Sequence, residues 1–425
     1  MRERIVLLSG GTSARAAIIA LLTALFEVAG FAIALTRPTN VFSPEAPWLA
    51  GGAVAAGLLT TLLLPRVFPL DSLVMALTNF LCGTGLVVLM TVSPGYGERQ
   101  IVFYLGGLMF MLGMSLIVTR LRYLRALSVL AAALGILGLL LPLLFGEWIN
   151  GARNWVSLFG LSPIQPSEFA KLCLIFVLAH AFSAHRTLAQ SLPALLFAAA
   201  CVLLLMLQRD LGTALIYALT TLVIFFAATG NVPLTALGLV GGMGAAVVGY
   251  RLFAHVKVRV AMWRNPWSDP NGSGYQIIQA LLAIGSGGKF GVGLGRGTPE
   301  KIPAYFNDFI FAVVCEQLGQ VFGVLLIAGY VLLILRGATL VTRARRSFGM
   351  LLGCGVLSVL AIQTFMITAG VIKMIPLTGV TMPFLSYGGS SLVSCLGMIG
   401  ILHGTDASVR HALEEDFLRM KTRWR

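Results

Sequence analysis

Apolar segments close to the length of a membrane-spanning helix dominate this sequence. Twelve such segments lie near residues 14–35, 47–64, 72–93, 101–119, 124–146, 169–184, 190–207, 211–229, 232–252, 308–335, 347–370 and 382–402. A helix that crosses a bilayer needs about 20 apolar residues. Only 11% of the residues are charged, against about a quarter in a soluble domain. The runs are continuous rather than alternating, so they exclude a transmembrane barrel and a soluble enzyme. They predict an all-α polytopic membrane protein with about 12 transmembrane helices.

Basic residues indicate the orientation of the chain, because they favour the cytoplasmic side of a membrane. With the N-terminus inside, 17 of the 30 basic residues are cytoplasmic. Seven of the others crowd into one outer segment, namely Arg251, Lys257, Arg259, Arg264, Lys289, Arg296 and Lys301. When that segment is left out, basic residues are far more numerous on the cytoplasmic side than on the outer side, which strongly favours an N-in/C-in topology. The crowded segment is expected to hold its cations for an anionic ligand, whereas nucleic acid is not expected as a partner.

No internal repeat or low-complexity linker divides the chain. We predict a two-helix N-terminal addition at 1–70, a membrane core at 71–405 and a basic cytoplasmic tail at 406–425. The core contains a large outer loop at about 252–307. Within that loop, residues 276–284 form an apolar run that is too short to span a bilayer, which predicts an interfacial or re-entrant helix.

Few ionisable residues lie at membrane depth, where a charge is costly and usually functional. Glu168 and Lys171 stand three residues apart at a predicted helix start, so their side chains share a face and can pair. Asp210 and Asp308 are each expected to cap the helix that follows. Asp269, taken alone, fits an ordinary Asp-Pro turn.

Four groups of motifs carry a resemblance to a known family. They are Gly-Ala-Arg-Asn-Trp (151–155) with Ile-Gln-Pro-Ser-Glu-Phe-Ala-Lys (164–171), Gln-Arg-Asp-Leu-Gly-Thr-Ala (208–214), Asn-Pro-Trp-Ser-Asp-Pro (265–270) through Gly-Tyr-Gln (274–276), and Pro-Leu-Thr-Gly (376–379) through Pro-Phe-Leu-Ser-Tyr-Gly-Gly-Ser-Ser (383–391). In order and spacing the sequence resembles the SEDS family of RodA, FtsW and SpoVE over roughly residues 72–405. These proteins are membrane glycosyltransferases that polymerise peptidoglycan from lipid II.

The resemblance implies a SEDS-like ten-helix core, beyond which the two N-terminal helices are an addition. It implies that the protein is a peptidoglycan glycosyltransferase of the bacterial cytoplasmic membrane, releasing undecaprenyl pyrophosphate in an inverting transfer at the outer face. Asp269 matches the catalytic aspartate and would act as general base, while Lys171 and Glu168 complete the catalytic set. The residues implied in substrate binding are Arg153, Arg264, Lys289, Arg296, Lys301, Tyr275, Gln276 and Ser390.

The implied partner is a class B penicillin-binding protein, whose transpeptidase crosslinks the new glycan. No cofactor is required by the sequence, although a divalent cation is compatible with a departing pyrophosphate. The family commonly has a His before Asp-Phe-Ile-Phe, whereas this chain has Phe306 and Asn307 there. Two alternatives stay open: a flippase or transporter for a lipid-linked sugar, and a non-catalytic scaffold of the cell-wall machinery. Roles in elongation, division and sporulation are equally compatible with the sequence.

Overall fold

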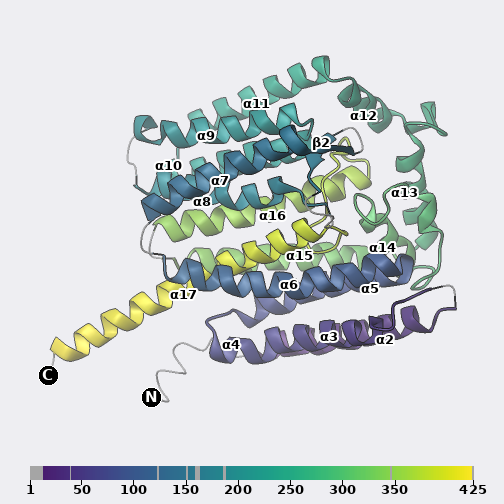
Figure 1. Ribbon diagram of the computed structural model, residues 1–425, viewed down its shortest axis with the longest axis horizontal. Coiled ribbons are helices and arrows are strands. Elements are labelled where there is room, and N and C mark those ends of the chain that lie inside the picture. Colours follow the sequence, from purple (N-terminus) through teal and green to yellow (C-terminus); the bar gives the residue numbers. More distant parts are fainter. Residues whose placement is uncertain are drawn as a thin grey trace.

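The computed structural model (Figure 1) describes residues 13–423, except 39, 122–123, 150–151, 158–162, 185–187 and 345–346. The start of the predicted N-terminal addition, residues 1–12, and the last two residues of the predicted basic tail lie outside this part of the chain. Most of the described residues form long helices that run side by side along the horizontal direction of Figure 1. The fold is therefore that of a helical bundle.

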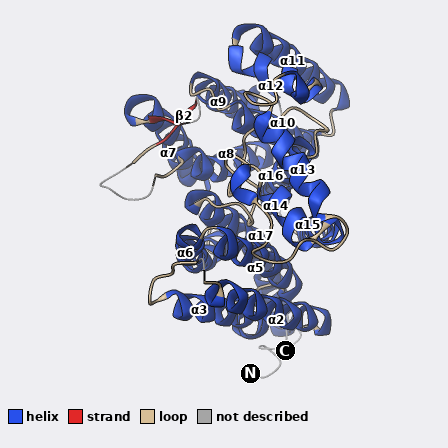
Figure 2. Ribbon diagram, turned by 90° about the vertical axis from the view of Figure 1, so that its right-hand side faces the viewer, coloured by secondary structure: helices blue, strands red, loops and turns tan. Residues whose placement is uncertain are grey.

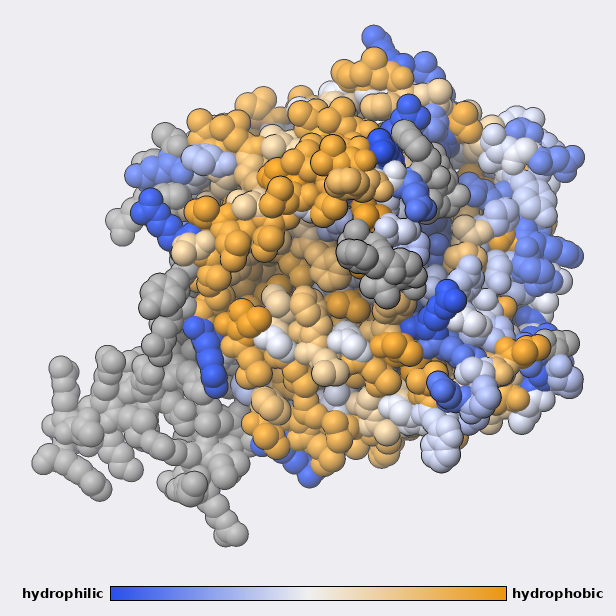
Figure 3. All heavy atoms as spheres, viewed as in Figure 1, coloured by the Kyte–Doolittle hydropathy of each residue, from blue (hydrophilic) through white to orange (hydrophobic). Residues whose placement is uncertain are grey.

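Eleven helices in the described part of the chain are long and apolar enough to cross a membrane. The long helices are α2 (Ala14–Thr36), α3 (Ala46–Leu58) continued by η1 (Leu59–Leu63) and α4 (Leu64–Val67), α5 (Ser72–Val92), α6 (Pro94–Thr119), α7 (Leu124–Phe145), α8 (Pro166–Ala184), α9 (Leu188–Leu207), α10 (Leu211–Thr229), α11 (Val232–Leu252), α15 (Gln320–Val341), α16 (Ser347–Val371) and α17 (Gly389–Arg423). Apolar side chains cover the middle of the bundle surface and polar ones gather at its ends (Figure 3). The prediction of an all-α polytopic membrane protein is confirmed.

One predicted span is interrupted. The segment 308–335 forms two helices, α14 (Ile310–Leu318) and α15, which meet at Gly319. Gly319 has a φ of 90°, and a β-carbon there would lie 2.3 Å from the carbonyl oxygen of Lys289. Backbone bonds from Gln320 N to Gly288 O (2.9 Å) and from Gly293 N to Gln317 O (3.0 Å) hold the outer loop against this break. Only glycine fits such a backbone approach at positive φ.

The two N-terminal helices form a layer on one side of the bundle, below α5 and α6 in Figure 2. Helix α2 packs on α5, and α3 packs on α6. In the described residues of α5 nearly every side chain is buried, and small residues let its neighbours approach closely. Gly83 is one of them, because a β-carbon there would lie 2.0 Å from Oε1 of the buried Glu27 in α2. The N-terminal helices are therefore packed against the core.

The large loop covers the end of the bundle that lies opposite both termini (Figure 1). It contains α12 (Ala254–Arg264), η2 (Pro266–Ser268), α13 (Tyr275–Gly287) and η3 (Pro299–Lys301), beside a hairpin of β1 (Glu147–Ile149) and β2 (Ala152–Trp155). The predicted short helix at 276–284 is thus present as α13, which runs across the bundle axis rather than along it. Figure 2 looks onto this end of the molecule.

A carboxylate ties two core helices together at the end that bears the termini. Asp71 caps α5 by accepting hydrogen bonds from the backbone nitrogens of Leu73 (3.1 Å) and Val74 (3.0 Å). Its Oδ2 also accepts a hydrogen bond from Nη2 of Arg336 in α15 at 2.6 Å, and its Oδ1 accepts one from Nε at 3.2 Å. One side chain therefore supplies both a helix cap and a two-point ion pair.

Replacing Asp71 by alanine should lower the free energy of unfolding by about 2 kcal/mol, because both the cap and the partly exposed ion pair are lost. Titration of the purified protein with SDS in detergent micelles measures this change. The control is Arg66→Ala, which removes an exposed charge at the same end and is expected to change stability little. Equal stability of the two variants would contradict the linking role of Asp71.

Candidate functional site

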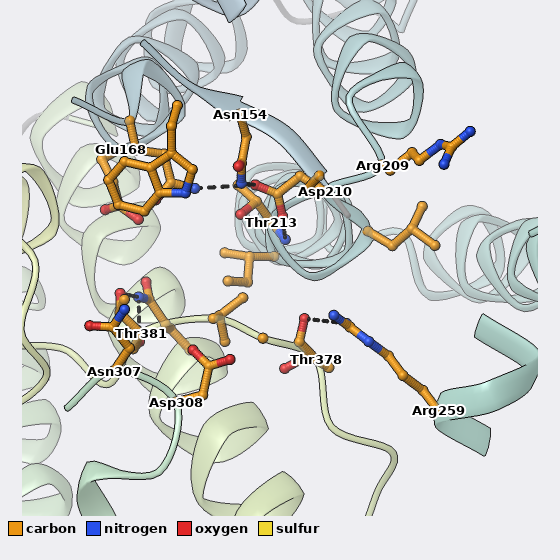
Figure 4. Close-up of a pocket in the computed structure, with 18 residues that line it drawn as sticks. Asn154, Glu168, Arg209, Asp210, Thr213, Arg259, Asn307, Asp308, Thr378 and Thr381 are labelled. Carbon is orange, nitrogen blue, oxygen red and sulfur yellow. Dashed lines mark hydrogen bonds between the residues drawn. The ribbon is translucent and has the colours of Figure 1, made fainter. Parts of the chain in front are cut away.

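A polar cavity opens beneath the outer loop, where several parts of the chain meet (Figure 4). Its volume is about 140 Å³. Its lining comes from the β2 hairpin, α8, the α9–α10 turn, α12, the segment before α14, α16 and the α16–α17 loop. The lining residues are Ala152, Asn154, Trp155, Gln165, Glu168, Arg209, Asp210, Leu211, Thr213, Ile216, Arg259, Asn307, Asp308, Gln363, Thr378, Gly379, Val380 and Thr381. Ionisable and amide side chains from segments far apart in the sequence therefore share one space.

A buried ion pair forms one wall of the cavity. Pro166 begins α8, and two residues later Glu168 places its Oε2 2.7 Å from Nζ of Lys171. Lys171 is 1% exposed and also donates to Oε1 of Gln363 at 3.1 Å, while the hydroxyl of Ser394 donates to Glu168 at 2.9 Å. The predicted pairing of Glu168 with Lys171 is confirmed. Glu168 faces the cavity and Lys171 lies behind it.

Asp210 holds the hairpin against the bundle. It caps α10 by accepting from Thr213 N at 3.1 Å, which confirms the predicted cap. Its Oδ2 accepts from Nδ2 of Asn154 at 2.8 Å and from Nε2 of Gln165 at 3.2 Å. These bonds fix Asn154 at the cavity wall, where its buried Oδ1 has no partner among the described residues.

Asp308 faces the cavity, and the prediction that it caps the following helix is wrong. Phe309 occupies the cap position of α14, and no side chain makes a capping bond there. A β-carbon on Gly379 would lie 3.2 Å from Nη2 of Arg259 and 3.6 Å from Oδ2 of Asp308, so these two charged groups flank one glycine. Burial raises the pKa of Asp308 to about 6, with the Arg259 guanidinium opposing the shift and the Asp210 carboxylate adding to it.

Asp269 lies outside the cavity, on an exposed turn between η2 and α13. Its Oδ2 accepts a hydrogen bond from the backbone nitrogen of Ser273 at 2.7 Å, as in an Asp-Pro turn. The structure thus brings Glu168 and Lys171 together and keeps Asp269 apart from them. Its assignment as general base stays a prediction.

The predicted substrate-binding residues are spread over the outer end. Arg153 donates to the carbonyl oxygens of Gly146 (2.9 Å) and Leu144 (3.4 Å), so its guanidinium closes the end of α7. The hydroxyl of Ser390 accepts from Gln165 N at 3.2 Å. Exposed on the loop are Arg264, Lys289, Arg296 and Lys301, whereas Tyr275 and Gln276 are half-buried at the start of α13. None of these eight residues lines the cavity.

Asp308, Arg259 and Arg209 line the cavity, although the sequence did not single them out as site residues. A signal for Asp308 was present, because it opens the Asp-Phe-Ile-Phe motif at the edge of an apolar segment. An ionisable residue at that boundary is a functional candidate. Arg259 could not be told from its six basic neighbours in the loop, since only folding decides which of them points inward.

The described residues contain no group of three or more His, Cys, Asp or Glu side chains placed to hold a metal ion. The side chains at the cavity therefore do not form a ready ligand set for a divalent cation. A role for a divalent cation stays a prediction.

Sequence comparisons place the chain among known proteins. Residues 72–411 match the model of the cell cycle protein family of FtsW, RodA and SpoVE. Peptidoglycan glycosyltransferase RodA of Mycobacterium tuberculosis is 36% identical over 376 residues, covering 81% of this chain and 79% of its own. The probable peptidoglycan glycosyltransferase FtsW of Bacillus subtilis is 33% identical over 374 residues, with 80% and 91% covered.

Solved structures resemble the fold as well. A peptidoglycan synthase complex that coordinates polymerisation and crosslinking contains a chain with a TM-score of 0.65 and 27% identity, covering 78% of this chain and 96% of that one. Thermus thermophilus rod shape determining protein RodA has a TM-score of 0.55 and 30% identity, with 78% and 95% covered. The two N-terminal helices precede the matched region of the family.

The buried ion pair generates a stability prediction. Replacing Lys171 by methionine should destabilise the protein by about 3–5 kcal/mol, because Glu168 is left buried without its counter-charge. The double variant Glu168→Gln/Lys171→Met should recover most of that loss, since no charge is stranded. SDS titration of the three proteins measures the difference. Equal stability of the single and double variants would show that the pair is not coupled.

Proposed function

The chain belongs to the cell cycle protein family of FtsW, RodA and SpoVE, and on that premise we propose how its cavity polymerises glycan. It is a peptidoglycan glycosyltransferase, as its curated relatives from Mycobacterium and Bacillus are named. We take lipid II as both donor and acceptor, at the outer face of the bacterial cytoplasmic membrane. The observation that carries the proposal is a cavity with carboxylates and cations beneath the outer loop.

In the proposed reaction the 4-hydroxyl oxygen of the acceptor GlcNAc attacks the anomeric carbon of the donor MurNAc. The bond from that carbon to the pyrophosphate oxygen breaks, and undecaprenyl pyrophosphate leaves with the electron pair. A carboxylate takes the proton of the attacking hydroxyl. Attack from the face opposite the leaving group inverts the anomeric centre. The protein must therefore provide a base on one side and positive charge on the other.

Asp308 is our candidate for the base. A general base works best when its pKa lies near the working pH, and burial raises the pKa of Asp308 to about 6. Its carboxylate lines the cavity beside Asn307, whose buried Oδ1 has no partner among the described residues. An unpaired acceptor next to a base suits a substrate rich in hydroxyl groups. Asp269 is the rival candidate, and it would have to act from its exposed turn.

Glu168 and Lys171 have a positioning role in this proposal. Lys171 is 1% exposed, pairs with Glu168 and donates to Gln363, so in this arrangement its ammonium group is buried away from a ligand in the cavity. Gln363 in turn donates to the carbonyl oxygen of Thr381 at 2.8 Å, within the loop that lines the cavity. The ion pair thereby holds the α16–α17 loop in place.

The proposed partner is a class B penicillin-binding protein. The structural neighbour that belongs to a peptidoglycan synthase complex supports this, since crosslinking accompanies polymerisation in that complex. An exposed outer loop that carries Arg264, Lys289 and Arg296 provides a polar surface at the same end of the molecule as the cavity.

Substitution separates the two candidate bases. Asp308→Asn should reduce lipid II polymerisation by the purified protein at least about 100-fold, because general-base catalysis contributes roughly that much. Asp269→Asn should keep most of the activity, since an asparagine side chain can also accept the Ser273 hydrogen bond. Gel analysis of labelled glycan chains measures both. The opposite pattern would return the role of base to Asp269. An inactive wild type that still binds lipid II would favour the transporter or scaffold alternatives.

The raised pKa of Asp308 predicts a pH dependence. A base must be deprotonated to accept a proton, so kcat/KM should be low at pH 5, rise through about pH 6 and level off above pH 7. Initial rates between pH 5 and 8 measure the profile. Lys257→Ala, which alters an exposed residue of α12, should show the same profile. A flat profile for wild type would argue against a base of this pKa.

A further inference from the structure

We propose that the two N-terminal helices brace the outer loop above the cavity, with Arg37 as the positioning residue through which they act. This inference rests on the proposed function, because it concerns how the loop that leads to the candidate base is held. Helix α2 ends at Thr36, and Figure 1 draws this end of α2 on the same side of the bundle as the outer loop. The two helices precede the matched region of the family, so the brace adds to the family's core.

A glycine-rich segment of the outer loop, residues 291–297, wraps around the end of α14. Every second residue in it is a glycine with a φ between 70° and 107°, a conformation that glycine adopts without strain. The backbone nitrogen of Gly293 donates to the carbonyl oxygen of Gln317 at 3.0 Å, and that of Gly295 donates to Oε1 of the same residue at 3.3 Å. The position of the segment therefore depends on Gln317.

Gln317 connects this segment with a core helix. It is 1% exposed, and its Oε1 also accepts a hydrogen bond from Oγ1 of Thr91 at 3.3 Å. Thr91 lies near the outer end of α5, the helix on which α2 packs. One buried amide therefore joins the outer loop, α14 and α5.

Arg37 lies against this junction from the side of the N-terminal helices. Its Nη1 donates to the carbonyl oxygen of Thr91 at 3.5 Å. A β-carbon on Gly295 would lie 2.8 Å from Nη1 and 3.5 Å from Cζ of Arg37, so the guanidinium group packs directly against the loop backbone. A guanidinium group is planar and always charged, which lets one side chain pack on a backbone segment and donate hydrogen bonds at the same time. Arg37 thereby contacts α5 and the outer loop together.

The backbone of Arg37 is held in place as well. Pro38 disfavours a helical conformation in the residue before it, so α2 ends and Arg37 takes an extended conformation. Further along the connection to α3, the backbone nitrogen of Ser43 donates to Oε1 of Glu98 in α6 at 3.0 Å. The chain is therefore fixed on both sides of Arg37, and a prepositioned side chain loses little conformational entropy when it makes its contacts.

The braced segment leads to the cavity wall. Directly after it, the backbone nitrogen of Thr298 donates to Oε1 of the buried Glu316 at 3.0 Å. Beyond the buried Ile302, the chain reaches Asn307 and Asp308, which line the cavity. A loop that is fixed in this way holds the candidate base in a defined position. When the segment loosens, that base is displaced, and a misplacement of about 1 Å can lower the rate about 100-fold.

Hydrogen exchange of the purified full-length protein in detergent tests the brace itself. Mass spectrometry follows the backbone amides of residues 292–298, and those of residues 172–180 in α8 serve as an internal reference. Arg37→Ala should raise the exchange rate of the loop amides about fivefold or more, because local opening becomes easier, and leave α8 unchanged. Arg37→Lys should give an intermediate rate, since lysine keeps the charge but lacks the planar fork of donors. A wild-type rate for the loop in Arg37→Ala would overturn the inference.

Lipid II polymerisation tests whether the brace positions the site. Arg37→Ala should lower kcat about tenfold with a smaller change in KM, because the candidate base is displaced while the rest of the cavity lining is kept. The matched control is Arg66→Ala, which removes the same charge from an exposed position at the other end of the N-terminal helices and should be as active as wild type. Both variants should unfold at the same SDS concentration as wild type, so that a loss of activity does not reflect a loss of fold.

The outcomes separate this inference from the proposed function. Faster loop exchange in Arg37→Ala with an unchanged kcat would overturn the positioning role. Equal losses of kcat in Arg37→Ala and Arg66→Ala would overturn it too, because removal of any charge from the N-terminal helices would then have the same effect. Faster loop exchange in Arg37→Ala, when the wild type makes no glycan, would refute the proposed function and keep the brace.

Discussion

A buried ion pair at the start of α8 organises the part of the bundle that encloses the cavity. Glu168 and Lys171 would be costly to bury separately, and together they recruit a hydroxyl from α17 and an amide from α16. Through Gln363 this network reaches the backbone of Thr381 in the loop between those helices. The position of that loop, and with it the position of the cavity wall, depends on a pair of charges that is almost fully buried.

Three carboxylates around the cavity illustrate how environment assigns different roles to one functional group. Glu168 is neutralised by an ammonium group, and Asp210 accepts bonds from a helix start and two amides. Among the residues that the structure describes, Asp308 has no comparable set of hydrogen-bond donors, and burial raises its pKa. A carboxylate with a raised pKa is the natural proton acceptor, which favours Asp308 in that role.

The long helices were predictable because bilayer thickness fixes their length and composition, and the pairing of Glu168 with Lys171 followed from helical spacing. The cavity was harder to predict, because segments far apart in the sequence build it and no local pattern indicates that they meet. The position of Asp308 before a helix predicts a cap, whereas Phe309 occupies the cap position of α14 and no side chain makes a capping bond there. The charge of Arg153 predicts an anion site, but its guanidinium donates hydrogen bonds to the carbonyl oxygens of Gly146 and Leu144.

The glycine contact between the outer loop and the start of α15 has an evolutionary consequence. Main-chain hydrogen bonds hold residues 288–293 against the break at Gly319, and they do not depend on which side chains the loop carries. Exposed positions such as Lys289 can therefore be exchanged without altering the path of the loop. Natural selection is free to vary the side chains of this surface, while the glycines beneath it must be retained.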